Sequence, residues 1–138
     1  VGGYRSDTTR MFHVAEPSAR YRQIHAVVLA AQKAAVAAVR PGVSAESIDA
    51  AARSVIEEAG FGEFFIHRTG HGIGLDGHED PYIVAGNDQQ IRSGMAFSIE
   101  PGIYLPGEFG VRIEDIVVCS DSGAERMNTS SREVAIVQ

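Results

Sequence analysis

The sequence predicts an α+β fold in which two helices are followed by an antiparallel sheet. Two alanine-rich segments between residues 18 and 60 carry apolar side chains at helical spacing. Beyond Gly60 the chain changes to short apolar runs separated by Pro-Gly and other turn dipeptides, a pattern typical of strands. The 138 residues contain neither an internal repeat nor a linker, so we expect them to belong to one domain.

Both helices have start and stop signals. The first is expected to begin at Pro17-Ser18, with Ser18 as the N-cap or Pro17 in the first turn, and to end before Pro41-Gly42. The second is expected to begin after the N-cap residue Ser44 and to end at Gly60. Small alanine faces would let the helices approach each other, or a sheet, closely.

The expected strands are short and rich in β-branched and aromatic residues. The first lies within residues 1–15, and three others follow the helices. These later strands are expected at Ala96–Glu100, Val111–Cys119 and Val134–Val137.

The composition excludes several classes of function. Apolar residues make up 44% and charged residues 22%, as in a folded soluble protein, and no run of about 20 apolar residues could span a membrane. A net charge of -6 with only 12 Lys and Arg argues against nucleic acid as the partner. Cys119 is the single cysteine, which excludes an internal disulfide framework. No leader pattern opens the chain, so the expected location is cytoplasmic.

Two acids stand where strands would bury them. Glu100 and Glu114 each follow an isoleucine on an apolar run, and a turn at Pro106-Gly107 would bring both carboxylates to one face of a hairpin. Two carboxylates buried together repel each other unless they take up protons or bind a divalent cation. The alternative is that one acid faces solvent while the other pairs with Arg112 or Arg92.

A glycine-rich segment adds three histidines. His67, His71 and His78 cluster in a way that ordinary core histidines do not, and glycines on both sides of His71 allow close approach to its backbone. Asp7 lies in a third polar segment, where its alternative role is to cap a turn or a strand end. Together, Asp7, His71, Glu100 and Glu114 form an oxygen-rich set with one imidazole, which suits Mn, Co or Zn. Two such ions could activate water to hydrolyse an amide or a phosphoester.

These segments resemble the pita-bread metallopeptidases, a family of Xaa-Pro dipeptidases (prolidases), Xaa-Pro aminopeptidases and methionine aminopeptidases. The resemblance covers nearly the whole chain and implies the second half of that fold, with two helices packed on a curved antiparallel sheet. It rests on motifs in the family's order: Tyr4–Arg10, His67–Glu79, Met95–Tyr104, Gly110–Asp115 and Ser130–Glu133.

The resemblance implies two divalent metal ions, with Mn preferred and Co or Zn also suitable. Asp7 and Glu114 would bridge the ions, and His71 and Glu100 would complete the coordination of one of them. Glu100 would also carry a proton from the attacking water to the leaving amine.

The resemblance also implies a substrate. His67 and His78 would line its pocket, with His78 holding the scissile carbonyl, and Arg112 would support a metal-binding carboxylate. His67, His78 and Pro81-Tyr82 indicate the Xaa-Pro branch. The implied activity is hydrolysis of Xaa-Pro bonds in dipeptides or peptide N-termini, by attack of a metal-activated hydroxide.

One departure from the family's pattern is large. Its first metal-ligating Asp would lie four residues before Val1, which begins the sequence without an initiator Met. Residues 1–138 are therefore expected to be the C-terminal portion of one catalytic domain, without its N-terminal half. One ion would then be poorly held, Arg112 would lose its expected partner, and the isolated chain would be weakly active or inactive. An exposed apolar edge would favour a homo-oligomer.

A second class of function stays open. The chain could be an inactive fragment or a non-catalytic binding module of the same fold. All four ligand positions keep ligating side chains, which favours the enzyme. The sequence does not separate a dipeptidase from an aminopeptidase.

Overall fold

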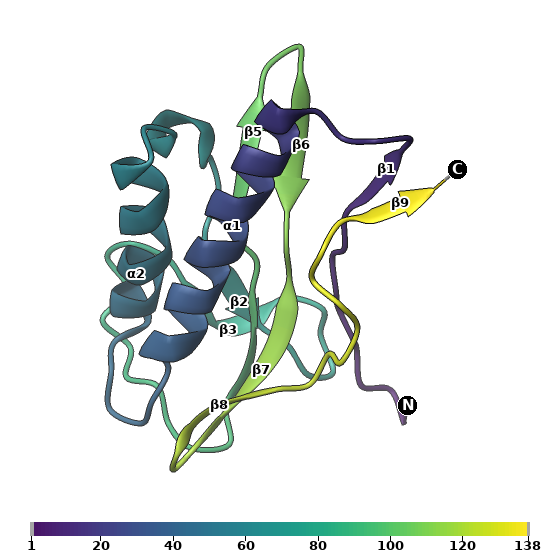
Figure 1. The fold of residues 1–138 in the computed structure, drawn as a ribbon. Coiled ribbons are helices and arrows are strands. Elements are labelled where there is room, and N and C mark those ends of the chain that lie inside the picture. The colour runs from purple at the N-terminus through teal and green to yellow at the C-terminus, as the bar shows by residue number, and fades with distance from the viewer. Residues whose placement is uncertain (1, 138) are drawn as a thin grey trace.

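The computed structural model describes residues 2–137, in which two helices cover one face of an antiparallel sheet (Figure 1). Helix α1 (Ala19–Ala38) and helix α2 (Ala45–Glu58) lie side by side. A short 3-10 helix, η1 (Gly62–Phe64), follows them. The predicted α+β order of helices and then sheet is confirmed.

The helix ends follow the predicted signals with one variation. The Ser18 hydroxyl accepts the Tyr21 N–H and caps α1. Ser44 stands at the start of α2, but its side chain accepts no capping hydrogen bond. The free N–H groups of Ala45 and Glu46 instead donate to carbonyls of residues 89 and 87, so the loop before β4 takes over the capping.

The main sheet has five strands in the order β3-β2-β4-β7-β8, and every neighbouring pair is antiparallel. Its core side is apolar and packs against alanines and isoleucines of the two helices, including Ile24, Ala31, Ile48 and Ala52. The strands are β2 (Gly70–Gly72), β3 (Glu79–Ile83), β4 (Ala96–Ile99), β7 (Asp115–Ser120) and β8 (Gly123–Arg126).

The predicted strand Val111–Cys119 is divided in two. Strand β6 (Phe109–Arg112) pairs with β5 (Gly102–Leu105), whereas β7 pairs with β4. The hairpin predicted at Pro106-Gly107 is therefore present, but its ladder breaks around Pro101 and Ile113. Glu100 and Glu114 lie at this break, directly after the end of β4 and directly before the start of β7.

Strands β2 and β3 lie in the glycine-rich segment, where no strand was predicted. A Cβ added at Gly70 would stand 1.9 Å from the Ser98 carbonyl oxygen, and one at Gly72 would stand 2.2 Å from the Asp80 carbonyl oxygen. The two glycines therefore let β2 fit between its neighbouring strands, in addition to exposing the backbone of His71.

The first predicted strand is much shorter than residues 1–15. Only β1 (Phe12–Val14) is regular, and it pairs in parallel with β9 (Ala135–Val137). Residues before β1 run along the break in the sheet, where Thr9 forms an isolated bridge with Glu114. This crossing is what carries Asp7 to the site. No helix within residues 2–137 is long and apolar enough to cross a membrane.

Candidate metal centre and substrate pocket

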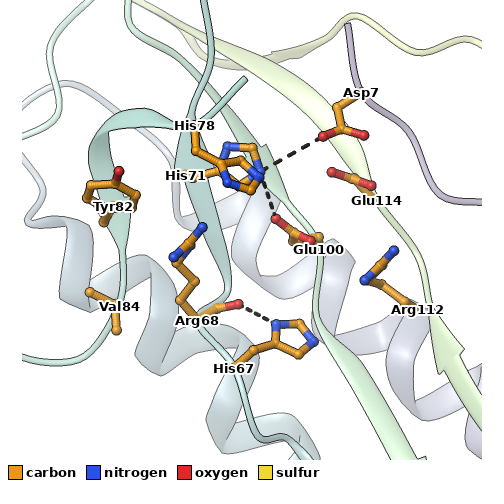
Figure 2. A pocket seen from close by; sticks show the side chains of 10 residues that line it. All are labelled: Asp7, His67, Arg68, His71, His78, Tyr82, Val84, Glu100, Arg112 and Glu114. Carbon is orange, nitrogen blue, oxygen red and sulfur yellow. Dashed lines mark hydrogen bonds and ion pairs between the residues drawn. The ribbon is translucent and has the colours of Figure 1, made fainter. Parts of the chain in front are cut away.

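The residues singled out in the sequence line one cavity of about 810 Å³ (Figure 2). They come from the segment before β1, from β2 and its flanking loops, and from the break between β4 and β7. The sequence-predicted members are Asp7, His67, His71, His78, Glu100, Arg112 and Glu114. Arg68, Tyr82 and Val84 complete the lining and were not predicted as site residues.

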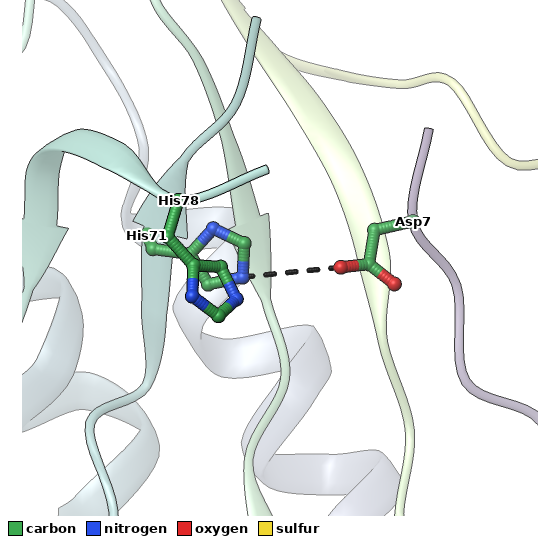
Figure 3. Close-up of side chains that lie close together, drawn as sticks. All are labelled: Asp7, His71 and His78. Carbon is green, nitrogen blue, oxygen red and sulfur yellow. Dashed lines mark ion pairs between the residues drawn. The ribbon is translucent and has the colours of Figure 1, made fainter. Parts of the chain in front are cut away.

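Two overlapping groups within the cavity have ligand atoms close enough to share a metal ion. His71, Glu100 and Glu114 form one group, and Asp7, His71 and His78 form the other (Figure 3). Within each group the ligand atoms lie within 4.8 Å of one another. His71 belongs to both groups, and His78 enters as a candidate ligand although the sequence predicted it only as a substrate contact.

Hydrogen-bond contacts of both the backbone and the ring fix the orientation of His71. Its N–H donates to the Ser98 hydroxyl, and its Nδ1 lies 3.0 Å from the carbonyl oxygen of Gly72. A proton on Nδ1 would satisfy that carbonyl and leave Nε2 as the ligand atom. Nε2 lies 3.1 Å from Glu100 Oε1 and 4.0 Å from Asp7 Oδ2.

The charges of His71 and Glu100 support each other. Burial alone would lower the pKa of His71, but its hydrogen bonds to Glu100 and to the Gly72 carbonyl outweigh burial and raise that pKa. Burial alone would raise the pKa of Glu100, yet hydrogen bonds from His71 and Ser98 lower it. The contact of 3.1 Å between His71 Nε2 and Glu100 Oε1 thus favours the charged form of both groups.

Within residues 2–137 no cationic side chain forms an ion pair with Glu114. Its side chain is buried, and it accepts a hydrogen bond of 2.6 Å from the Thr9 hydroxyl. Burial raises the pKa of Glu114 to about 7, and the charges of Glu100 and Asp7 add to the effect. The cavity thus places three carboxylates near the imidazoles of His71 and His78, a donor set that fits divalent cations. The predicted alternative for the two glutamates does not occur, since neither Arg112 nor Arg92 forms an ion pair with them in the described chain.

Thr9 is a site residue that the sequence reasoning missed. Its hydroxyl donates to Glu114 and accepts a hydrogen bond of 3.1 Å from Arg112 Nε. Arg112 therefore supports Glu114 through Thr9 rather than by direct contact. The signal was available, because Thr9 lies in the same motif as Asp7 and two residues after it.

Arg10 and Asp115 anchor the segment that carries Asp7. Arg10 donates from Nη1 to the Glu114 carbonyl at 2.6 Å and from Nη2 to Asp115 Oδ1 at 2.6 Å. Asp115 is fully buried and also accepts a hydrogen bond of 2.9 Å from Gln32 on α1. The Asp7–Thr9 segment is thereby tied to β7 and to a helix directly behind the candidate ligands.

The histidine-rich loop is held by α2. Asp49 accepts hydrogen bonds from the N–H and the hydroxyl of Thr69 and from both ends of the Arg53 guanidinium. Arg53 also donates to the carbonyl of His67. The His67 ring is fixed by contacts of Nε2 with the Tyr104 hydroxyl at 2.9 Å and of Nδ1 with the Arg68 carbonyl. His78 is exposed at the cavity mouth, with its ring centroid 3.9 Å from that of His71.

The raised pKa values predict how the metal-free protein responds to pH. Glu114 binds a proton in the folded state up to about pH 7, whereas in the unfolded chain it loses the proton near pH 4.5. The folded state therefore holds more protons across this window, and the free energy of unfolding falls as pH rises through it. His71, whose pKa is also raised, acts in the same direction as pH rises above 6.5.

Urea unfolding of chelator-treated protein should therefore give a lower midpoint at pH 8 than at pH 5.5. Added Mn²⁺ should reverse the trend, because metal ions bind the deprotonated ligands. In the variant Glu114→Gln the difference between the two pH values should shrink. An unchanged difference in that variant would show that other groups cause it.

Comparison with known proteins places the chain in a family. Residues 1–121 match the model of metallopeptidase family M24. The chain is 48% identical over 135 residues to the Xaa-Pro dipeptidase of Lactobacillus helveticus, covering 98% of this chain and 37% of the relative. It thus spans about a third of the length of the curated relatives that it matches.

Two solved structures have the same fold. The dipeptidase PepE of Mycobacterium ulcerans is 56% identical, with a TM-score of 0.96 over 98% of this chain and 36% of that structure. The X-Pro aminopeptidase of Thermotoga maritima is 43% identical, with a TM-score of 0.96 over 98% and 38%. The resemblance inferred from the motifs and the α+β pita-bread fold are both confirmed, and the chain belongs to metallopeptidase family M24.

Proposed function

We propose that this chain forms the C-terminal portion of the catalytic domain of a dinuclear-metal peptidase that cleaves Xaa-Pro bonds of dipeptides or peptide N-termini. The observation that carries the proposal is the convergence of Asp7, His71, Glu100 and Glu114 on one cavity from four separate segments. Dipeptidases and an aminopeptidase that act on Xaa-Pro bonds, by their names, are 43–48% identical to the chain and support this substrate class.

The chain's own groups have distinct proposed roles. Asp7 and Glu114 would bridge two divalent ions, and His71 and Glu100 would complete the coordination of one. When bound, such ions supply a water activated at neutral pH and polarise the scissile carbonyl. The carboxylate of Glu100 would serve as the general base and acid of the reaction, holding a proton between the attack on the scissile carbonyl and the departure of the leaving nitrogen.

The remaining polar groups would act on the substrate and on the ligands. His67 and His78 line the cavity and could donate hydrogen bonds to the scissile carbonyl as negative charge develops on its oxygen. Arg112 would keep the Glu114 carboxylate oriented through the Thr9 hydroxyl. Mn is the ion we favour, and Co or Zn would also fit the donor set.

The test is metal analysis and peptide hydrolysis with the full-length protein that carries this chain. We expect bound Mn, Co or Zn and cleavage of Ala-Pro, with cleavage lost after chelation and restored by Mn²⁺. A protein that binds no metal and leaves Ala-Pro intact would contradict the proposal and favour the non-catalytic binding module.

The chain spans only about a third of the length of its relatives, and this leads to a second expectation. The 138-residue chain should hydrolyse Ala-Pro far more slowly than a version extended upstream, because one ion would be held only by Asp7 and Glu114. Equal rates for the two versions would show that the residues described here form a complete site.

A further inference from the structure

Ser98 is a hydroxyl residue in strand β4 to which the proposed reaction gives no role. Ten residues of the described chain line the cavity, and Ser98 is not among them. Its side chain is fully buried, on the face of β4 opposite to Phe97 and Ile99, which pack into the apolar core. Burying a hydroxyl costs free energy unless hydrogen bonds compensate for the loss of water. The partners of the hydroxyl therefore indicate why a serine stands in this apolar strand.

The Ser98 hydroxyl joins two candidate metal ligands. It accepts the N–H of His71 at 2.9 Å and donates to Glu100 Oε1 at 2.9 Å. The direction of both bonds is fixed, because a backbone N–H can only donate and a hydroxyl has a single proton. That proton is thus left for the Glu100 carboxylate. One side chain therefore holds the backbone of β2 and the carboxylate that follows β4.

The neighbouring backbone leaves room for this hydroxyl and holds Glu100 in place. A Cβ added at Gly70 would stand 3.1 Å from Ser98 Oγ and 1.9 Å from the Ser98 carbonyl oxygen. The Glu100 N–H donates to the Thr69 carbonyl at 2.7 Å. The backbone of Glu100 is thereby fixed to the segment before His71, and contacts of the side chain decide how its carboxylate is turned.

Those side-chain contacts are all on one carboxylate oxygen. Glu100 Oε1 accepts from Ser98 and lies 3.1 Å from His71 Nε2, whereas no hydrogen bond or ion pair within residues 2–137 reaches Oε2. When His71 Nε2 serves as a metal ligand, it no longer donates to Glu100. The Ser98 hydroxyl is then the side-chain donor in the described chain that still holds this carboxylate, with Oε2 left free.

We propose that Ser98 is a positioning residue that holds the Glu100 carboxylate in the orientation needed for metal binding and for proton transfer. This inference rests on the proposed peptidase function. Because Ser98 does not line the cavity, it acts through Glu100 and not by contact with the substrate. Its removal should therefore change metal affinity and kcat while the KM for the substrate stays nearly constant.

The experiment compares Ser98→Ala with the natural full-length protein. Calorimetric titration gives the Kd for Mn²⁺, and kcat and KM for Ala-Pro are measured at saturating Mn²⁺. Ser98→Ala should raise this Kd and lower kcat, each by about tenfold to hundredfold, with KM within about twofold, because residues that orient metal ligands have effects of this size. Ser98→Thr keeps the hydroxyl and should bring Kd and kcat back to within about threefold of the natural values.

A second background separates positioning from a general effect on the fold. In Glu100→Ala protein, Ser98→Ala should raise the Kd for Mn²⁺ by less than about threefold, because the carboxylate on which Ser98 acts is absent. Melting temperatures show whether each variant is folded, since Ser98→Ala also leaves the buried His71 N–H without its acceptor. If Ser98→Ala does not fold, Ser98→Cys replaces it with the same expected losses, because a thiol is similar in size but a weak donor.

The control is Ser120→Ala. The Ser120 hydroxyl donates to the Gly123 carbonyl at 2.9 Å, at the end of β7 that is remote from Glu114. Its loss should leave the Kd for Mn²⁺, kcat and KM unchanged.

Three results would overturn the assignment while the proposed function stands. They are natural values of Kd and kcat in Ser98→Ala, an equal rise in Kd with and without the Glu100 carboxylate, and a folded Ser98→Thr protein that behaves like Ser98→Ala. A natural protein that binds Mn²⁺ but leaves Ala-Pro intact would refute the proposed function, and the Kd values would then decide on Ser98. A protein that binds no divalent ion would refute both.

Discussion

Replacing Glu100 by glutamine in the full-length protein is expected to lower kcat/KM for Ala-Pro by about a thousandfold. Glu100 is both a candidate metal ligand and the proposed proton carrier, and general acid–base groups contribute about 10²–10⁴. Glutamine has nearly the same size and can still accept the hydrogen bond of 2.9 Å from the Ser98 hydroxyl. The loss would therefore reflect chemistry rather than packing.

Kinetics, metal content and the pH profile should be measured together for this variant. Glu125→Gln is the matched control, because Glu125 is exposed on β8, away from the cavity. A Glu100→Gln protein with full metal content and more than a tenth of the natural activity would refute both proposed roles of Glu100.

Replacing Asp115 by alanine is expected to lower the free energy of unfolding by about 3–5 kcal/mol, the range for breaking a buried ion pair on one side. Asp115 is fully buried and accepts hydrogen bonds from Arg10 and Gln32. Arg126 Nε lies 2.9 Å from Asp115 Oδ2 as an ion pair, although its N–H is not aligned for a hydrogen bond. Alanine would leave the nearly buried Arg10 without a counter-charge.

Urea unfolding of the metal-free protein measures this effect. The control is Asp121→Ala at the exposed turn between β7 and β8, where a change below about 0.5 kcal/mol is expected. A loss of less than 1 kcal/mol for Asp115→Ala would show that water or neighbouring groups replace the carboxylate. Because Arg10 also holds the Glu114 carbonyl, Asp115→Ala should weaken Mn²⁺ binding as well.

The parts of the fold that could be predicted are those with a local signal. Both helices follow from apolar periodicity within each segment and from the capping or turn residues at its ends. The hairpin at Pro106-Gly107 follows from its turn residues. The parallel pairing of β1 with β9 could not be predicted, because it joins segments more than 100 residues apart. Neither strand has a sequence pattern that identifies its partner.

The candidate site likewise has features with a local signal in the sequence and features without one. The chemical types of Asp7, His71, Glu100 and Glu114, and the motifs that contain them, are visible in the sequence and sufficed to indicate the family. Their convergence depends on a break in the β4–β7 and β5–β6 ladders that strand propensity does not reveal. Arg68 could not be predicted as a site residue for a related reason: its place in the cavity depends on packing, which the neighbouring sequence does not reveal.

The sequence by itself determined the two helices, the hairpin at Pro106-Gly107 and the side chains that could bind a metal, because these depend on residue type and short spacing. Only the tertiary structure decided that Thr9 reaches Glu114 across 105 residues and that Asp115 gathers Arg10 and Gln32 behind the site. Such contacts arise where the whole core fixes distant segments against each other, and the energy that fixes them lies in burial rather than in any local pattern.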